Sequence, residues 1–103
     1  KSKMKKEIFD DYATAVAKRF HLTLDEMFTS SRRQDLVDAR QMLYYLCMER
    51  PIRISYIQRF LETYNFKVTH STIIHGYNKA KESMKNDTDV TNLINDILKS
   101  TNV

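Results

Sequence analysis

The sequence predicts an all-α fold, a compact domain of about five to six helices. Glycine and proline occur once each, whereas sheet-rich domains use both freely in their turns. Apolar residues instead recur at helical spacing along most of the chain. The length of 103 residues is that of one domain, so residues 1–103 are interpreted as a single helical unit.

The first helix is predicted over about residues 5–20, and a short second helix over about 24–28. Thr23 and Glu26 have the spacing of a capping box, in which each side chain bonds the backbone N–H of the other residue. The apolar stripe of the first helix comprises Ile8, Phe9, Tyr12, Ala15, Val16 and Phe20.

Residues 29–37 interrupt this pattern and predict an exposed loop, either irregular throughout or with a helical turn, that carries Arg32 and Arg33. These two arginines are either ordinary surface charge or a clamp for phosphate. The next helix is expected to start with Asp38 as its cap and to end before Pro51. It is predicted to be the central helix, with an inner stripe of Ala39, Met42, Leu43 and Leu46.

Arg40 and Tyr44 lie one turn apart on the least apolar side of this central helix. Gln41 completes a capping box with Asp38. A charged residue in the first turn is well held in orientation, so Arg40 either pairs with a nearby carboxylate or presents its charge to a ligand.

Two further helices, over about 53–64 and 70–85, are predicted to form a helix-turn-helix. Asn65 is suited to end the first of them because asparagine tolerates positive φ. Thr69 is suited to cap the second. The stripe of the first comprises Ile54, Ile57, Phe60, Leu61 and Tyr64.

Gly76 lies inside the second of these helices, where glycine costs about 0.5–1 kcal/mol relative to alanine. We therefore expect the backbone of another helix to approach it closely. A turn cluster over 86–89 precedes a last helix over about 89–99, whose stripe comprises Val90, Leu93, Ile94, Ile97 and Leu98.

The helix over 70–85 has two unlike faces. Its core stripe comprises Ile73, Tyr77, Ala80 and Met84. Its opposite face is polar and comprises Ser71, His75 and Asn78, flanked by Thr72 and Lys79. A helix that reads base edges in the major groove needs such a face near its N-terminus, although any surface helix has a polar side.

The charge balance favours polyanionic partners without proving one. The chain has 17 basic and 13 acidic residues, a net charge of +4, and a basic stretch over 1–6 that is either a flexible arm or the edge of an excised piece. Cys47 is the only cysteine and is expected to be a buried thiol. No apolar run approaches the roughly 20 residues of a membrane span, so no membrane partner is expected.

Catalysis is not expected, and neither is a metal, a cofactor or a nucleotide. His70 and His75 are about 140° apart around a helix, too far to converge on a metal ion. Asp10 and Asp11 diverge by about 100°. A chain with a single glycine also has no glycine-rich phosphate-binding loop.

Three segments carry a family resemblance: residues 22–28, Ala39-Arg40-Gln41-Met42 with Tyr45-Leu46, and His70-Ser71-Thr72-Ile73-Ile74-His75. Over about residues 8–98 the chain resembles the C-terminal DNA-binding domain of the bacterial replication initiator DnaA. The family's Gly-Gly-Arg-Asp before the histidine is replaced here by Phe66-Lys67-Val68-Thr69, so the base-reading aspartate is absent.

The resemblance implies sequence-specific binding of double-stranded DNA. It implies that helix 70–85 enters the major groove, that Arg40 enters an adjacent minor groove, and that Arg32 contacts the DNA backbone. The candidate DNA-binding residues are Arg32, Arg33, Arg40, Gln41, Thr69, His70, Ser71, Thr72, His75, Asn78 and Lys79.

The alternative is a protein-interaction module, a replication inhibitor or adaptor that reuses the same scaffold. An exposed apolar patch around Tyr44, Met48 and Tyr56 would favour it. In either case we expect a stand-alone or excised domain, phage or plasmid encoded, in the cytoplasm and nucleoid of a bacterial or phage-infected cell. The oligomeric state and the choice between replication and transcription are not predicted.

Overall fold

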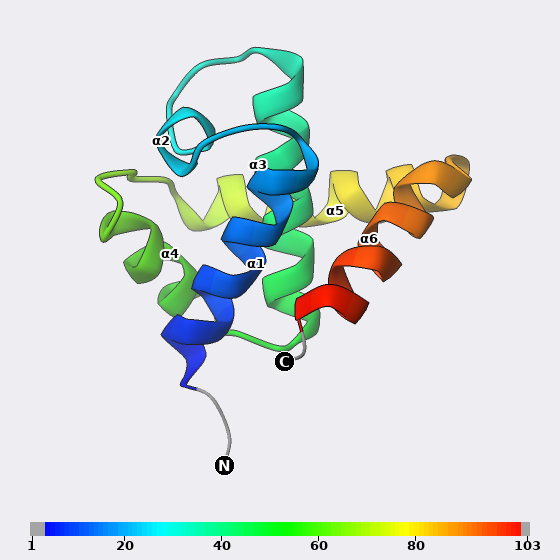
Figure 1. Cartoon of the computed structure of the whole chain (residues 1–103). Coiled ribbons are helices and arrows are strands. Elements are labelled where there is room, and N and C mark those ends of the chain that lie inside the picture. The colour runs from blue at the N-terminus through cyan, green and yellow to red at the C-terminus, as the bar shows by residue number, and fades with distance from the viewer. Residues whose placement is uncertain (1–3, 102–103) are drawn as a thin grey trace.

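The computed structural model describes residues 4–101, which fold into six helices and no strand (Figure 1). The predicted all-α fold is confirmed. Lys5 and Lys6 open the first helix, and residues 1–3 of the basic stretch lie outside the described residues. The helices are α1 (Lys5–Arg19), α2 (Leu24–Met27), α3 (Gln34–Glu49), α4 (Ile54–Glu62), α5 (His70–Asn86) and α6 (Thr88–Thr101).

Helix α3 is the centre of the molecule, as its apolar pattern predicts. α5 crosses α3 and packs against it more extensively than any other helix does, while α1 packs on α3 from another side (Figure 1). Seven residues of α3 are buried, so this helix is surrounded by its neighbours along most of its length.

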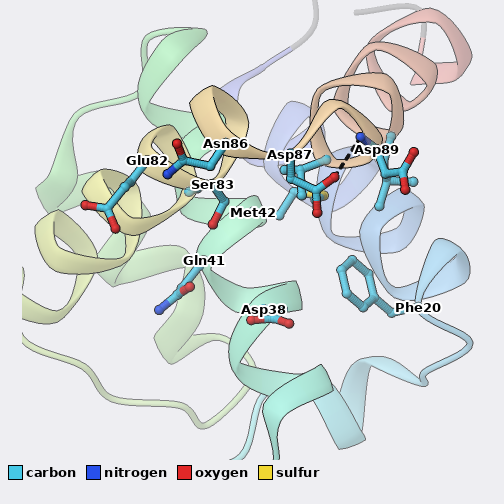
Figure 2. A pocket seen from close by; sticks show the side chains of 12 residues that line it. Phe20, Asp38, Gln41, Met42, Glu82, Ser83, Asn86, Asp87 and Asp89 are labelled. Carbon is cyan, nitrogen blue, oxygen red and sulfur yellow. Dashed lines mark hydrogen bonds between the residues drawn. The ribbon is translucent and has the colours of Figure 1, made fainter.

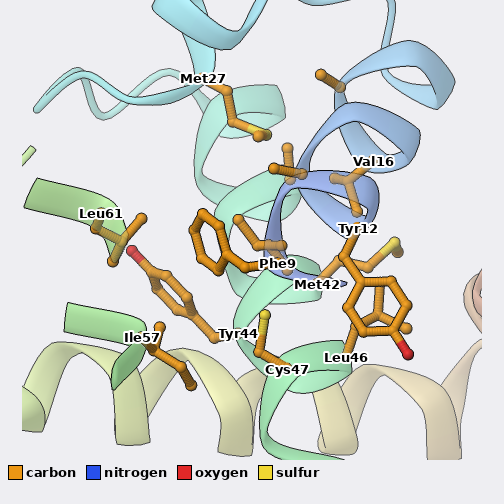
Figure 3. Packing of buried hydrophobic residues seen from close by; sticks show 14 of the residues in the cluster. Phe9, Tyr12, Val16, Met27, Met42, Tyr44, Leu46, Cys47, Ile57 and Leu61 are labelled. Atoms are coloured by element: carbon orange, nitrogen blue, oxygen red, sulfur yellow. The ribbon is translucent and has the colours of Figure 1, made fainter. Parts of the chain in front are cut away.

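One continuous apolar core joins all six helices. Figure 3 shows the part of it that α1, α2, α3 and α4 contribute. Fully burying one such side chain is worth about 1.5–3 kcal/mol. Cys47 is part of this core and is free. Burial raises the pKa of its thiol, so Cys47 is an inert core residue, as predicted. The largest fully buried side chains are Phe9, Met27, Leu43, Leu46, Ile57, Leu61, Ile73, Ile94 and Ile97.

The start of α3 corrects the sequence-based prediction. The helix begins at Gln34 with Arg33 as its N-cap, not with Asp38. Asp38 lies inside the helix, where its carboxylate accepts a hydrogen bond from Gln34 Nε2 at 2.7 Å. The first turn of α3 has no clear apolar stripe in the sequence, because Leu36 is its only buried residue and Val37 is half-buried.

Tyr44 is a second correction, because its side chain is only 2% exposed. Its ring fills the space beside Gly76, where an added Cβ would lie 2.6 Å from Tyr44 Cδ2. The close approach expected at Gly76 is therefore made by a side chain and not by a helix backbone. The least apolar side of α3 faces α5 at this point and not solvent.

Helix α6 is longer than predicted, and one member of its stripe is not in the core. Ile94 and Ile97 are buried, whereas Leu98 is 46% exposed. Only one narrow side of α6 meets α1 and α5, so an apolar residue at the edge of the stripe stays in solvent.

Between α4 and α5 the chain makes a wide turn over residues 63–69. α4 ends at Glu62, two residues before the predicted end. Asn65 has φ 59°, which confirms its predicted left-handed conformation. Phe66 N donates to the carbonyl of Leu61 at 3.2 Å, so the turn folds back onto the end of α4 before it reaches α5.

Candidate nucleic-acid interface

Segments from four parts of the chain enclose a shallow hollow of about 390 Å³, which we name the Arg40 hollow. Five predicted DNA-binding residues, from the loop after α2, from α3 and from α5, line it: Arg32, Arg40, Gln41, Thr72 and His75. Its other side is formed by the turn residues Phe66, Lys67 and Val68. The fold therefore brings together residues that are up to 43 positions apart in the sequence (75 minus 32).

Arg40 lines this hollow and contacts three neighbouring segments of the chain. Its Nη1 donates to the carbonyl of Met27 at 3.0 Å, and its Nη2 donates to the carbonyl of Ser31 at 2.7 Å. Its guanidinium also lies 5.7 Å from the centroid of the Phe66 ring. The partners are carbonyls and an aromatic face, not the carboxylate that one prediction allowed.

Arg40 keeps its positive charge, and its carbonyl partners use only part of its hydrogen-bond donors. Burial lowers the pKa of the guanidinium, but arginine stays charged at neutral pH. A guanidinium has five N–H donors, and the two carbonyls occupy two of them.

The N-terminus of α5 is capped as predicted. The backbone N–H of Thr72 donates to Thr69 Oγ1 at 3.1 Å, and the two threonine hydroxyls lie 3.0 Å apart. A cap of this kind stabilises a helix by about 1 kcal/mol. Thr69 therefore has a structural role, and the hydroxyl of Thr72 already has one partner.

The outward face of α5 is exposed at Ser71, His75 and Asn78. Lys79 is also exposed, and its Nζ lies 3.8 Å from Glu82 Oε1, a long contact of the kind that contributes little. Ser71 is exposed but does not line the Arg40 hollow, whereas His75, one turn farther along α5, does. This face is therefore available to a partner along the first two turns of the helix.

Two predicted residues lie at the margins. Arg33 is exposed and pairs with Asp35, with Nε 2.7 Å from Oδ1 and Nη2 3.1 Å from Oδ2. Its hydrogen bond and charge lower the pKa of the Asp35 carboxyl. His70 lies on the flank of α5 that faces α4, where it lines a separate hollow with Lys5 and Arg53.

Sequence reasoning missed two residues of this region. Lys67 lines the Arg40 hollow from the turn, and its only signal was a basic residue inside a helix-turn-helix connection. Gln58, on α4, contacts both Val68 and His70. Because these partners lie 10 and 12 positions away, no helical spacing in the sequence indicates the contact.

A second hollow, of about 600 Å³, lies on the other side of Gln41 and is acidic (Figure 2). Asp38, Glu82, Asp87 and Asp89 line it together with apolar residues that include Phe20 and Met42. Among the residues that the structure describes, no lysine or arginine lines it. We name it the acidic hollow. Its carboxylates make this hollow unfavourable for phosphate.

The described residues also bear on other kinds of site. Between residues 4 and 101, no three histidine, cysteine or acidic side chains are grouped so that they could hold a metal ion. In the same part of the chain, no helix combines the length and apolar character needed to cross a membrane.

The domain is all-α, and α4 and α5 follow one another through a turn. α5 also has a polar exposed face. These features place the domain in the helix-turn-helix class. Residues 10–80 match the family described as the bacterial dnaA protein helix-turn-helix, and the chain belongs to this family. Membership in this family indicates DNA binding, and the matched region is a helix-turn-helix.

Curated relatives agree with this assignment. The chain is 29% identical, over 80% of its length, to the chromosomal replication initiator protein DnaA of Lactiplantibacillus plantarum. It is 26% identical, over 84%, to that of Lachnoclostridium phytofermentans and 29% identical, over 84%, to that of Leifsonia xyli. The matches cover only 17% or 18% of these relatives, so the chain spans less than a fifth of their length.

Proposed function

We propose that this domain binds a specific double-stranded DNA site, with α5 in the major groove and Arg40 at an adjacent minor groove. The observation that carries the proposal is the Arg40 hollow, which gathers five candidate contact residues beside the exposed N-terminal face of α5. In this arrangement the start of α5 lies beside the loop that carries Arg32 and the turn that carries Lys67. Recognition helices meet DNA in a similar way, with basic side chains on the phosphates beside the helix N-terminus.

Phosphate contacts supply most of the affinity in this proposal. Arg32 and Lys67 lie on the rim of the Arg40 hollow, and Lys79 extends the basic surface along α5. Contacts of this kind fix the register of a protein on DNA without reading the sequence. Arg33 contributes less because Asp35 already offsets its charge.

Base contacts supply the specificity. Ser71 and His75 are exposed near the start of α5, where their hydroxyl and imidazole groups can bond base edges. The methyl group of Thr72 can pack on the methyl group of a thymine. Asn78 contributes only where the groove follows α5 for two turns.

Arg40 links the two grooves. The loop that it holds carries Arg32, so the same side chain that reaches the minor groove also positions a phosphate contact. A narrow, A·T-rich minor groove attracts arginine most strongly. The proposal includes no catalytic step, cofactor or nucleotide, and it places the domain in a bacterial or phage-infected cytoplasm, where DNA is accessible.

The direct test is a salt titration of binding to a duplex selected from a random library. Fluorescence anisotropy should give an affinity that falls steeply with salt, with a log–log slope of about −3 to −4 for three or four phosphate contacts. An affinity that stays constant between about 50 and 200 mM salt would contradict the proposal.

An exposed apolar patch was predicted to favour the protein-interaction alternative, and the structure does not support it. Tyr44 is buried and Met48 and Tyr56 are half-buried, so no exposed apolar patch lies there. The acidic hollow is the feature that still favours a partner protein, because its carboxylates and apolar lining suit a basic, partly apolar segment. Selective binding of such a segment, with no salt-dependent binding to any duplex, would favour this alternative.

A further inference from the structure

The side chain of Gln58 ties α4 to the turn and to the first residue of α5. Its Nε2 donates to the carbonyl of Val68 at 2.7 Å, and its Oε1 lies 3.0 Å from Nε2 of His70. Gln58 is half-buried and His70 is exposed. One amide therefore spans the end of the turn and reaches the helix that the proposed function places in the major groove.

The two contacts fix the orientation of this amide. A carbonyl can only accept, so the NH₂ group of Gln58 must face Val68. The Oε1 atom, which also only accepts, then faces His70, and Nε2 of His70 must carry a hydrogen. In a neutral imidazole the other nitrogen, Nδ1, is then an acceptor. Within residues 4–101, this Nδ1 has no hydrogen-bond partner.

We propose that Gln58 is a positioning residue for DNA recognition, which orders the wide turn and holds neutral His70 as the Nε2–H tautomer. Nδ1 of His70 then accepts a hydrogen bond from the exocyclic amino group of an adenine or a cytosine. These amino groups are the donors that bases present in the major groove, whereas guanine presents two acceptors there. The base contact rests on the proposed function, whereas the tautomer does not.

The turn explains why such a residue is needed. Residues 63–69 form a longer connection than the roughly three or four residues of an ordinary helix-turn-helix. Each additional ordered residue costs conformational entropy, and a loose turn would leave the first turn of α5 without a fixed position. Gln58 bonds the turn at Val68, directly before the cap Thr69, where a single contact sets the start of the helix.

The tautomer is tested by imidazole ¹⁵N NMR, at a pH where the His70 signals themselves show a neutral ring. Wild type should show nearly only the Nε2–H form. Gln58→Met, which removes both hydrogen bonds, should raise the share of the Nδ1–H form at His70 and leave His21 and His75 unchanged. Gln58→Glu, which keeps an acceptor, should retain the wild-type tautomer. Asn95→Met, which removes an exposed amide from α6, is the matched control.

Two tautomer results would overturn the proposed role of Gln58 in positioning His70. One is a dominant Nδ1–H form in wild type, and the other is a His70 tautomer that does not respond to Gln58→Met. Circular dichroism of the Met variant shows whether its helices are intact. His21 and His75 provide internal references in the same spectra, so a global change of fold is distinguished from a local one.

The base contact is tested on the selected duplex. Gln58→Met and His70→Ala should each lower specific affinity about tenfold, the scale of one good base contact. The double variant should bind little worse than His70→Ala, and random duplex should bind all of them similarly. Replacing one adenine by purine, or one cytosine by its analogue without the amino group, should weaken wild type and not His70→Ala.

Additive effects of the two substitutions, or a wild type that tolerates removal of every amino group in the site, would overturn the base contact. A wild-type protein that binds no duplex would overturn the proposed function and the base contact together. The NMR result would still decide whether Gln58 holds His70, so the two failures are distinguishable.

Discussion

Arg40 has the contacts of both a structural and a binding residue. Its two hydrogen bonds to carbonyls hold the end of α2 and the following loop against α3, and its stacking on Phe66 holds the turn. Three segments of the proposed interface are therefore positioned by one side chain. The family resemblance indicated Arg40 as a DNA contact, but no sequence pattern indicated its bonds to Met27 and Ser31.

Arg40→Ala should weaken binding to the preferred site by about 1–3 kcal/mol, because it removes a groove contact and loosens the loop that carries Arg32. Arg40→Lys should not restore affinity, because an ammonium cannot bridge two carbonyls as a guanidinium fork does. Gel-shift titration measures both, with Arg19→Ala as the control for loss of one exposed positive charge. A folded Arg40→Ala protein with wild-type affinity would refute the assignment.

Ser71→Ala combined with Thr72→Ala should relax the sequence preference more than it lowers affinity for random DNA. The reason is that short hydroxyl side chains at the start of α5 supply base contacts and no charge. Competition binding with single-base variants of the site measures the change, and Ser83→Ala, farther along α5, is the control. Equal losses on specific and random duplexes would argue against base reading.

At the scale of elements, the sequence predicts the features that have helical periodicity. It misses the features that depend on contacts with distant parts of the chain. The long apolar stripes and the caps at Thr23 and Thr69 are present as predicted. The first turn of α3 was not predicted because it contains one buried residue, Leu36, and one residue cannot establish a helical periodicity. The two-residue error at the end of α4 arose because Tyr64 is packed against the core from the turn and not from the helix.

Tyr64 also shows how a turn can imitate a helical stripe. Its ring lies 4.8 Å from that of Phe28, and its hydroxyl donates to Asp10 Oδ1 at 2.7 Å. Burial, with help from the Asp10 carboxylate, raises the pKa of Tyr64 to about 12. Tyr64 is thus packed against the core although it follows the end of α4.

The packing of α3 on α5 depends on Gly76. Gly76→Ala would place a Cβ 2.6 Å from the ring of Tyr44, which is 2% exposed and has little room to move. Overpacking costs about 1–3 kcal/mol, against a gain in helix propensity of about 0.5–1 kcal/mol. The expected result is a net loss of unfolding free energy and a displaced recognition helix.

Urea unfolding followed by circular dichroism measures this loss as a lower midpoint at unchanged slope. Ser83→Ala, at an exposed position of the same helix, should leave the midpoint nearly unchanged. A Gly76→Ala protein as stable as wild type would show that Tyr44 can move aside and that the close contact does not fix the position of α5.

At the scale of the whole molecule, charge is unevenly distributed although the net charge is only +4. Arg32, Arg40 and Lys67 border one hollow, and four carboxylates line another beyond Gln41. Composition alone predicted a tendency toward polyanions but not this separation. The separation arises because α5 crosses α3. The first half of α5 lines the Arg40 hollow and its second half lines the acidic hollow, while the first half of α3 contributes to both.

The central claim is that the Arg40 hollow and the start of α5 are the surface that meets DNA. The most direct measurement is a backbone-amide NMR titration of the labelled protein with its selected duplex. The account predicts the largest shift changes in residues 29–32, at Arg40, in residues 66–68 and in the first two turns of α5, with little change in α6. Changes concentrated on α6 and the acidic hollow, or no saturable change at all, would contradict it.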